Sequence, residues 1–202
     1  MKLGRRIRNG VGRAWLRAFG WRVEGGPPPV DKAVVVAAPH TSNWDLPFTL
    51  AVAWSLDRDV QWVGKHTLFA VPVWGRFMRS LGGIGVDRRT RNDSVKAIAH
   101  AIEERERVLL IVPPEGTRGA AKRWKTGFYW IAVEAEVPIV LGFLDYGRKR
   151  GGLAHVLQPS GDIAGDFERM RSFYADVRGK HPERQGRVAL AEDEPAASGA
   201  AD

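Results

Sequence analysis

The chain contains no cysteine in its 202 residues. Disulfide bonds and thiolate metal sites are therefore excluded, which fits a reducing compartment. Long apolar runs are missing as well, because the best stretch, WIAVEAEVPIVLGFL, is interrupted by Glu134, Glu136 and Pro138. A helix that spans a bilayer needs ~20 consecutive apolar residues. We therefore expect that the chain does not cross a membrane, which leaves open that it binds to the surface of one.

Acidic residues are scarce at the start of the chain. The basic residues there are Lys2, Arg5, Arg6, Arg8, Arg13, Arg17 and Arg22. Apolar residues recur among them at nearly helical spacing, at Leu3, Ile7, Val11, Trp15 and Phe19. This pattern predicts a basic amphipathic helix over residues 1–24, of the kind that lies in the interface of an anionic membrane. It fits equally a helix that packs on its own domain with its arginines in solvent, and the sequence leaves both interpretations open.

The charge balance gives little support to a nucleic-acid-binding protein. The chain has 31 basic and 23 acidic side chains, a formal net charge of +8. Most of this excess lies in residues 1–25, and no recognised nucleic-acid-binding motif is present. At the other end, residues 182–202 are charged and then rich in Ala, Gly and Ser. We therefore expect no nucleic-acid partner and a disordered tail.

From Asp31 onward, strand-like and helix-like segments alternate. The strand-like runs are residues 33–38, 60–63, 83–86, 108–112, 137–143 and 153–157. The helix-like segments are residues 44–56, 72–81, 94–105, 128–136 and 167–177. The alternation predicts an α/β fold, a single-domain sandwich over residues 30–180 with a central, largely parallel or mixed sheet flanked by helices. A chain of this length is long enough to bury one sizeable core.

Polar residues follow four of the predicted strands. His40 and Asp45 follow the first, Lys65 the second, Arg88 the third, and PPEGTR, residues 113–118, the fourth. In open parallel sheets, ligands bind beyond the carboxyl ends of the strands. Ordinary loop polarity explains any one of these features, but it explains their combination less well. The sequence therefore predicts a site at this edge of the sheet.

His40 and Asp45 are candidates for a base and the carboxylate that orients it. On a regular helix, five positions would place the two side chains about 140° apart, so they meet only if the chain turns between them. The Thr-Ser-Asn segment 41–43 offers N-caps for a helix that begins near Trp44, with Asp45 in its first turn. A carboxylate beside an imidazole fixes the tautomer and stabilises the imidazolium. By itself, this spacing is also typical of capping and loop polarity.

The segment PPEGTR offers an anion site. Gly116 permits close approach of the backbone, Thr117 supplies a hydroxyl and a backbone donor, and Arg118 a forked donor suited to phosphate. The alternative is a turn that closes a buried strand, with Glu115 and Arg118 as a surface ion pair. Taken alone, the segment favours the turn.

Together, four blocks resemble the glycerolipid acyltransferase family, whose best-known members acylate 1-acylglycerol-3-phosphate. HTSNWD matches the family's H-x4-D block, and PPEGTR its P-E-G-T-R block. Residues 64–88 resemble the block between them, and VPIVLGF, residues 137–143, the block that follows. The resemblance covers roughly residues 30–145. An H-x4-D about seventy positions before E-G-T-R is a specific combination, and it reverses the preference for the plainer interpretations above.

The resemblance implies roles for the candidate residues. His40 would deprotonate an acceptor hydroxyl and Asp45 would orient it, while the hydroxyl attacks the thioester of acyl-CoA or of acyl carrier protein. A second group would hold the phosphate or polar head of the acceptor: Glu115, Gly116, Thr117, Arg118, Lys65 and Arg88. The resemblance implies no metal, no cofactor and no covalent acyl-enzyme. It implies an enzyme of phospholipid biosynthesis on the cytoplasmic face of a membrane.

The sequence also departs from the family pattern. After E-G-T-R the segment reads GAAKRWKTG, with Trp124 and Lys125, and after the fourth block Asp145 and Tyr146 stand in an unusually distinctive stretch. These departures leave the acceptor open between lysophosphatidate and another lipid or metabolite with a hydroxyl or amine. A non-catalytic membrane-binding protein of the same fold is a further alternative.

Overall fold

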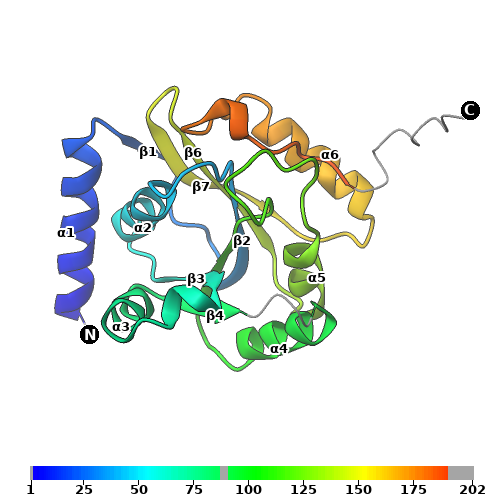
Figure 1. Ribbon diagram of the computed structural model, residues 1–202, viewed down its shortest axis with the longest axis horizontal. Helices are drawn as coiled ribbons and strands as arrows, with labels where there is room; N and C mark the ends of the chain where they lie inside the picture. The colour runs from blue at the N-terminus through cyan, green and yellow to red at the C-terminus, as the bar shows by residue number, and fades with distance from the viewer. Residues whose placement is uncertain (1, 87–90, 191–202) are drawn as a thin grey trace, which may run out of the picture.

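The computed structural model describes residues 2–86 and 91–190, in which seven strands form one sheet with helices on both faces (Figure 1). The strands are β1 (Arg22–Glu24), β2 (Lys32–Ala38), β3 (Val60–Lys65), β4 (Gly83–Val86), β5 (Val108–Val112), β6 (Ile139–Asp145) and β7 (Arg150–Leu157). The α-helices are α1 (Lys2–Ala18), α2 (Asp45–Ser55), α3 (Pro72–Ser80), α4 (Arg91–Glu103), α5 (Gly127–Glu134) and α6 (Ile163–Tyr174). Two 3₁₀ turns are η1 (His66–Phe69) and η2 (Pro182–Arg184).

The order of strands in the sheet is β1-β7-β6-β2-β5-β3-β4. β6, β2, β5, β3 and β4 run parallel to one another, whereas β7 pairs antiparallel with β6 and parallel with β1. β2 lies in the middle, and its apolar run KAVVVAA is buried on both sides. Continuous burial of this kind is expected of a central strand in a sheet that helices cover on both faces. The predicted α/β sandwich with a mixed sheet is confirmed.

Each face of the sheet has its own apolar core. Alternate β2 residues Val34 and Val36 pack in the core covered by α4, α5 and α6. Ala33 and Val35 point to the opposite face, where α2, η1 and α3 cover the sheet. α1 lies outside α2 (Figure 1) and buries Leu16 in a third cluster. All the carboxyl ends of the parallel strands therefore meet at one edge, held by cores on both sides.

The predicted elements are found with small shifts at their ends, but three short ones were not predicted. The expected first helix extends over residues 1–24, whereas α1 ends at Ala18 and residues 22–24 form β1, which pairs with β7. The 3₁₀ turns η1, after β3, and η2, after α6, were also missed. Each of the three has only three or four residues, so periodicity in the sequence cannot define them.

α1 packs on its own domain, and its outer apolar residues are exposed. One face packs on α2: a Cβ on Gly12 would lie only 2.7 Å from the carbonyl oxygen of Ala51, and the Asn9 amide donates to the carbonyl oxygens of Trp54 and Ser55. The opposite apolar residues stay exposed; the exposed fractions are 72% for Leu3, 58% for Ile7 and 52% for Val11. The helix is therefore docked on its own domain and still presents an apolar face. No helix in residues 2–86 and 91–190 is long and apolar enough to cross a membrane.

Candidate active site

The candidate residues gather where the central strands end. His40 follows β2, and the neighbours of β2 in the sheet are β5 and β6. The segment 113–118 follows β5, and Asp145 and Tyr146 lie at the end of β6. Three adjacent strands therefore deliver the H-x4-D segment, the P-E-G-T-R segment and the distinctive stretch after the fourth block to one place.

The structure brings His40 and Asp45 into contact. The distance between His40 Nδ1 and Asp45 Oδ2 is 3.0 Å. The backbone N–H groups of Thr41 and Ser42 both donate to the same oxygen, each at 2.9 Å. The carboxylate therefore closes the turn that brings its own residue back toward the imidazole.

The expected side-chain cap before α2 is wrong. Trp44 occupies the N-cap position and makes no side-chain capping bond. Ser42 Oγ instead accepts from the backbone N–H of Trp44, and Asp45 collects the free N–H groups of residues 41 and 42. Asp45 therefore binds the N–H groups of the turn that precedes α2, and not the first N–H groups of the helix itself.

This arrangement favours one form of the histidine. Asp45 is buried, and its Oδ2 accepts from two backbone N–H groups, so a neutral His40 that donates from Nδ1 fits this contact. In that tautomer Nε2 carries the lone pair. The His40 side chain retains 22% of its exposed surface, compared with 6% for Asp45. The geometry is that of an accessible base held by a buried carboxylate.

Tyr146 is the residue at this site that sequence reasoning singled out without assigning it a role. Its hydroxyl donates to the second oxygen of the carboxylate, Asp45 Oδ1, at 2.9 Å. Burial, together with the negative charge of Asp45, raises the pKa of Tyr146 far above its ordinary value of 10. The phenol therefore stays protonated and acts as a donor.

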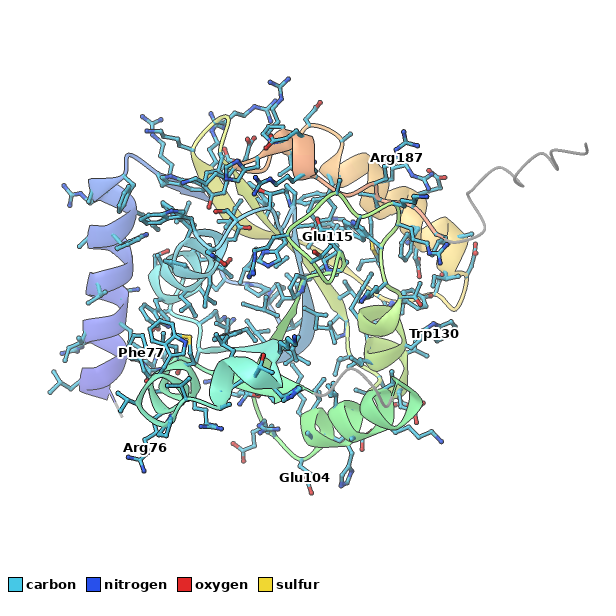
Figure 2. The ribbon with its side chains drawn as sticks, in the orientation of Figure 1. Arg76, Phe77, Glu104, Glu115, Trp130 and Arg187 are labelled. Atoms are coloured by element: carbon cyan, nitrogen blue, oxygen red, sulfur yellow. The ribbon has the colours of Figure 1, made fainter. Side chains whose placement is uncertain are left out.

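Glu115 lies below the surface and links the P-E-G-T-R segment to the H-x4-D segment through a hydrogen bond. Its side chain accepts from the backbone N–H of His40 at 3.1 Å, and only 3% of the residue is exposed. Figure 2 shows Glu115 near the centre of the molecule, while Glu104 and Arg187 lie at its periphery. Its second oxygen, Oε2, is buried without a hydrogen-bond partner among the residues that the structure describes. Burial raises the pKa of the Glu115 carboxyl above its ordinary value of 4.5. The alternative of a surface ion pair with Arg118 does not fit this burial.

The rest of the P-E-G-T-R segment faces solvent. Gly116 has a φ of +65°, a conformation that favours glycine, and the Lys125 side chain lies against it. Thr117 and Arg118 are exposed. Lys65 is exposed at the end of β3, which lies next to β5. Lys65, Thr117 and Arg118 therefore lie at or after the ends of adjacent strands, and Lys125, which was not predicted to belong to the site, joins them from the end of the loop before α5. Arg88 lies outside the described residues.

A hollow of about 170 Å³ opens beside Tyr146 on the side of α1. It is lined by aromatic rings and two lysines, namely Phe19, Trp21, Trp44, Phe48, Tyr146, Lys149 and Lys180. The Lys180 ammonium lies 4.9 Å from the centre of the Trp44 ring, a cation–π contact. Trp44 is 43% exposed at the rim of this hollow.

The segment after α6 crosses the site, so the expected disordered tail was placed too early. The backbone N–H of His181 donates to Thr41 Oγ1 at 3.2 Å, and that of Trp124 to the carbonyl oxygen of Ala189 at 3.0 Å. Leu190 is buried. Residues 182–190 therefore belong to the folded domain and cover Glu115. Their order could not be predicted from the sequence, because the segment contains too few apolar residues. Residues 191–202 lie outside the described residues.

The comparisons with known proteins identify the family of this chain. A family model described as Acyltransferase matches residues 21–140, more than half of the chain. This chain belongs to the acyltransferase family. The matched region begins at the end of α1 and includes the H-x4-D and P-E-G-T-R segments, so the predicted resemblance is confirmed.

Among curated relatives of this acyltransferase, the 1-acyl-sn-glycerol-3-phosphate acyltransferase of Escherichia coli is 27% identical over 130 residues, 60% of this chain and 52% of that protein. The enzyme of the same name from Haemophilus influenzae is 28% identical over 131 residues, 60% of this chain and 53% of that one. The chain thus spans about half the length of these relatives. The crystal structure of the 1-acyl-sn-glycerophosphate acyltransferase PlsC from Thermotoga maritima has a TM-score of 0.58 at 21% identity, covering 85% of this chain and 75% of that one. The latter similarity shows a shared fold.

Proposed function

We propose that this protein transfers a fatty acyl group from an acyl thioester, acyl-CoA or acyl carrier protein, to the hydroxyl of a lysophospholipid such as 1-acylglycerol-3-phosphate. The observation that carries the proposal is the contact between His40 and Asp45 at the sheet edge where the P-E-G-T-R segment also lies. The names of the curated relatives support the same acceptor class.

In the proposed reaction, His40 Nε2 takes the proton from the acceptor hydroxyl as its oxygen bonds to the thioester carbonyl carbon. The tetrahedral oxyanion then collapses, the carbon–sulfur bond breaks, and the imidazolium returns the proton to the departing thiolate. The products are an ester and a free thiol. Asp45 keeps Nδ1–H in place and stabilises the imidazolium between the two steps.

The acceptor phosphate would bind on the side of His40 that lies toward β5 and β3. Arg118 offers two parallel donors that match a phosphate, and Thr117, Gly116 and Lys65 lie on the same edge. Arg88 belongs to this proposal by sequence alone. Glu115 acts differently from the other members of the motif, because its carboxyl holds the His40 backbone. We therefore propose that it supports the site from below and leaves phosphate binding to the exposed residues.

The surface of α1 suits a peripheral position on the cytoplasmic face of an anionic membrane. Its apolar residues Leu3, Ile7 and Val11 are exposed, and the basic residues Arg6, Arg13 and Arg17 are exposed beside them. Helices of this kind lie with their apolar side in the headgroup boundary while arginines meet anionic lipid. A lipid acceptor would then reach the site from the membrane.

The test is acyl transfer by the purified protein, measured by mass spectrometry with acyl-CoA or acyl carrier protein and a panel of lysophospholipids and amino lipids. We expect His40→Ala to lose at least 10³-fold in kcat. Asp45→Asn should be strongly impaired while the fold is retained. Turnover of His40→Ala at the level of the natural protein would contradict the mechanism.

The same panel separates the acceptors. For a phosphorylated acceptor, Arg118→Ala should raise KM about tenfold or more, with a smaller effect on kcat, because it removes binding that the ground state and transition state share. An unchanged KM would favour the alternative proposal, an acceptor without a phosphate and with another hydroxyl or an amine. Thioester binding without turnover of any acceptor would favour a non-catalytic membrane-binding protein.

A further inference from the structure

The Asp45 carboxylate has two oxygens with different partners. Oδ2 is shared by the His40 imidazole and the backbone N–H groups of Thr41 and Ser42. Oδ1 receives the Tyr146 hydroxyl at 2.9 Å, from a residue 101 positions later in the chain. The imidazole, the carboxylate and the phenol thus form a continuous hydrogen-bonded series, in which the phenol is the only side-chain donor to Oδ1 among the residues that the structure describes.

Three independent restraints hold Tyr146 in this position. Asp145 closes the β6–β7 turn by accepting from the backbone N–H groups of Gly147 and Arg148 at 3.0 and 3.2 Å. The backbone N–H of Tyr146 itself donates to the carbonyl oxygen of Arg178 at 2.9 Å. Its ring meets the Trp21 ring edge-on, with 4.8 Å between their centres. A hydroxyl fixed from three sides can hold a carboxylate at a set distance, whereas a mobile phenol could not.

We propose that Tyr146 is a positioning residue that holds Asp45 and thereby sets how strongly His40 binds a proton. A hydrogen bond to an ionised carboxylate disperses part of its charge. The carboxylate that stabilises the His40 imidazolium is then weaker than a free one, so the imidazole more readily releases its proton to a leaving group. Without the phenol, Asp45 would attract the imidazolium more strongly and would also be less firmly oriented.

Other charged groups near this series come from two further segments and from the β6–β7 turn that also holds Tyr146. Glu115 contacts the His40 backbone from the loop after β5. Lys180, after α6, places its ammonium 5.9 Å from the centre of the Tyr146 ring, and Lys149 lines the same hollow from the β6–β7 turn. None of these groups changes in a Tyr146→Phe variant, which keeps the ring and deletes one hydroxyl. That variant therefore isolates the bond to Asp45.

The test is an NMR titration of histidine-labelled protein, in which the His40 signal is assigned by its loss in His40→Ala. The chain has five histidines, so the other four serve as internal references. In Tyr146→Phe, we expect the midpoint of the His40 titration to move to higher pH by roughly 0.5–1 unit. The other histidines should not move.

Tyr129→Phe is the matched control. Tyr129 also donates a hydrogen bond to a buried aspartate, Asp166, at 2.9 Å, but it lies in α5 and belongs to the core formed with α6. Its loss should affect stability and leave the His40 titration unchanged. An equal shift in both variants, or none in Tyr146→Phe, would overturn the proposal.

A second substitution tests the sign without deleting the contact. Site-specific 3-fluorotyrosine at position 146 is a stronger donor than tyrosine, so the His40 midpoint should move to lower pH, opposite to Tyr146→Phe. A shift in the same direction for both variants would mean that the structure around the site had changed and would also overturn the proposal.

The kinetic part of the test rests on the proposed function, and the NMR part does not. If the protein is an acyltransferase, Tyr146→Phe should lower kcat roughly tenfold, leave KM unchanged, and move the acid limb of the pH–rate profile upward. A shifted titration with no acyl transfer to any acceptor would retain the role of Tyr146 and reject the proposed function. Acyl transfer together with an unshifted His40 titration would retain the proposed function and reject the role of Tyr146.

Discussion

Glu115 is almost fully buried between the His40 backbone and the segment that returns after α6. A Cβ on Gly186 would lie 2.9 Å from Glu115 Cγ, so the chain passes directly over the carboxyl group. Such a group costs free energy when it is ionised, because only one of its oxygens has a partner among the described residues. Glu115 belongs to a motif that resembles a phosphate site, but in this structure it is buried and accepts a hydrogen bond from the His40 backbone.

This burial makes a prediction about stability. Because the pKa of Glu115 is raised in the folded protein, the folded state binds its proton more tightly than the unfolded state does. The resulting stability is present below the unfolded pKa and is lost as the pH rises through the folded pKa. Glu115→Gln has no ionisable carboxyl at this position, so it does not lose this stability as the pH rises. We expect its free energy of unfolding, relative to the natural protein, to be higher at pH 8 than at pH 4 by on the order of 1 kcal/mol.

Denaturant unfolding at the two pH values measures this difference. Glu106→Gln is the matched control, since Glu106 is exposed and its replacement should give a difference that does not depend on pH. A Glu115→Gln variant whose relative stability stays constant, or falls, between pH 4 and pH 8 would show that the carboxyl is not destabilised by burial.

At the scale of elements, the docking of α1 depends on a single glycine. Three glycines occur inside the helix and would weaken it by about 0.5–1 kcal/mol each relative to alanine. At Gly4 and Gly10 an added Cβ meets nothing within 4 Å, whereas at Gly12 it meets the backbone of α2. Only Gly12 is required by packing. The salt bridges Arg5–Asp57 and Arg8–Asp59 also join α1 to the segment after α2, but exposed ion pairs of this kind contribute little to the stability of a protein.

We therefore expect opposite effects from the same substitution at neighbouring glycines. Gly10→Ala should stabilise the protein by about 0.5–1 kcal/mol, because it improves helix propensity at an exposed position. Gly12→Ala should destabilise it by about 1–3 kcal/mol, because the methyl group forces α1 away from α2. Thermal or denaturant unfolding compares the two. A Gly12→Ala protein as stable as Gly10→Ala would mean that α1 docks differently.

At the scale of the whole molecule, the exposed apolar side of α1 and its neighbouring arginines form one surface. Arg5 and Arg8 are held by aspartates of the domain, whereas Arg6, Arg13 and Arg17 make no ion pair with any residue that the structure describes. The structure thus divides the basic residues of α1 into a set paired with the domain and a set exposed to solvent. The sequence alone treats all of them alike.

This division predicts how the protein binds vesicles. Replacing Arg6, Arg13 and Arg17 by glutamine should weaken binding to anionic vesicles about 100-fold, since each basic residue near such a surface contributes about 1 kcal/mol. Flotation with vesicles that contain or lack phosphatidylglycerol measures the effect. The paired residues Arg5 and Arg8, replaced together, are the control and should have a smaller effect. Flotation that is equal in all variants and in neutral vesicles would reject a charged membrane surface on α1.

The fold was largely predictable because its determinants are local. Apolar runs such as residues 108–112 identify strands, and the alternation with amphipathic helices identifies the class. β1 was not predictable, since three residues without an apolar pattern form a strand only when the β7 edge is already in place. The segment 182–190 is similar, because its order comes from contacts of Arg187 and Ala189 with Ala121 and Trp124, which are distant in the chain.

By itself, the sequence determined the chemistry available at the site. A histidine and an aspartate five positions apart, followed by P-E-G-T-R, supply the candidate reacting groups through side-chain types that no fold can alter. Only the tertiary structure decided how these groups are held. Glu115 became a buried support, and Tyr146 came into contact with Asp45 across 101 positions. The physical reason is that burial and hydrogen-bond partners depend on which strands lie side by side, and that order, β5-β2-β6, is not the order of the chain.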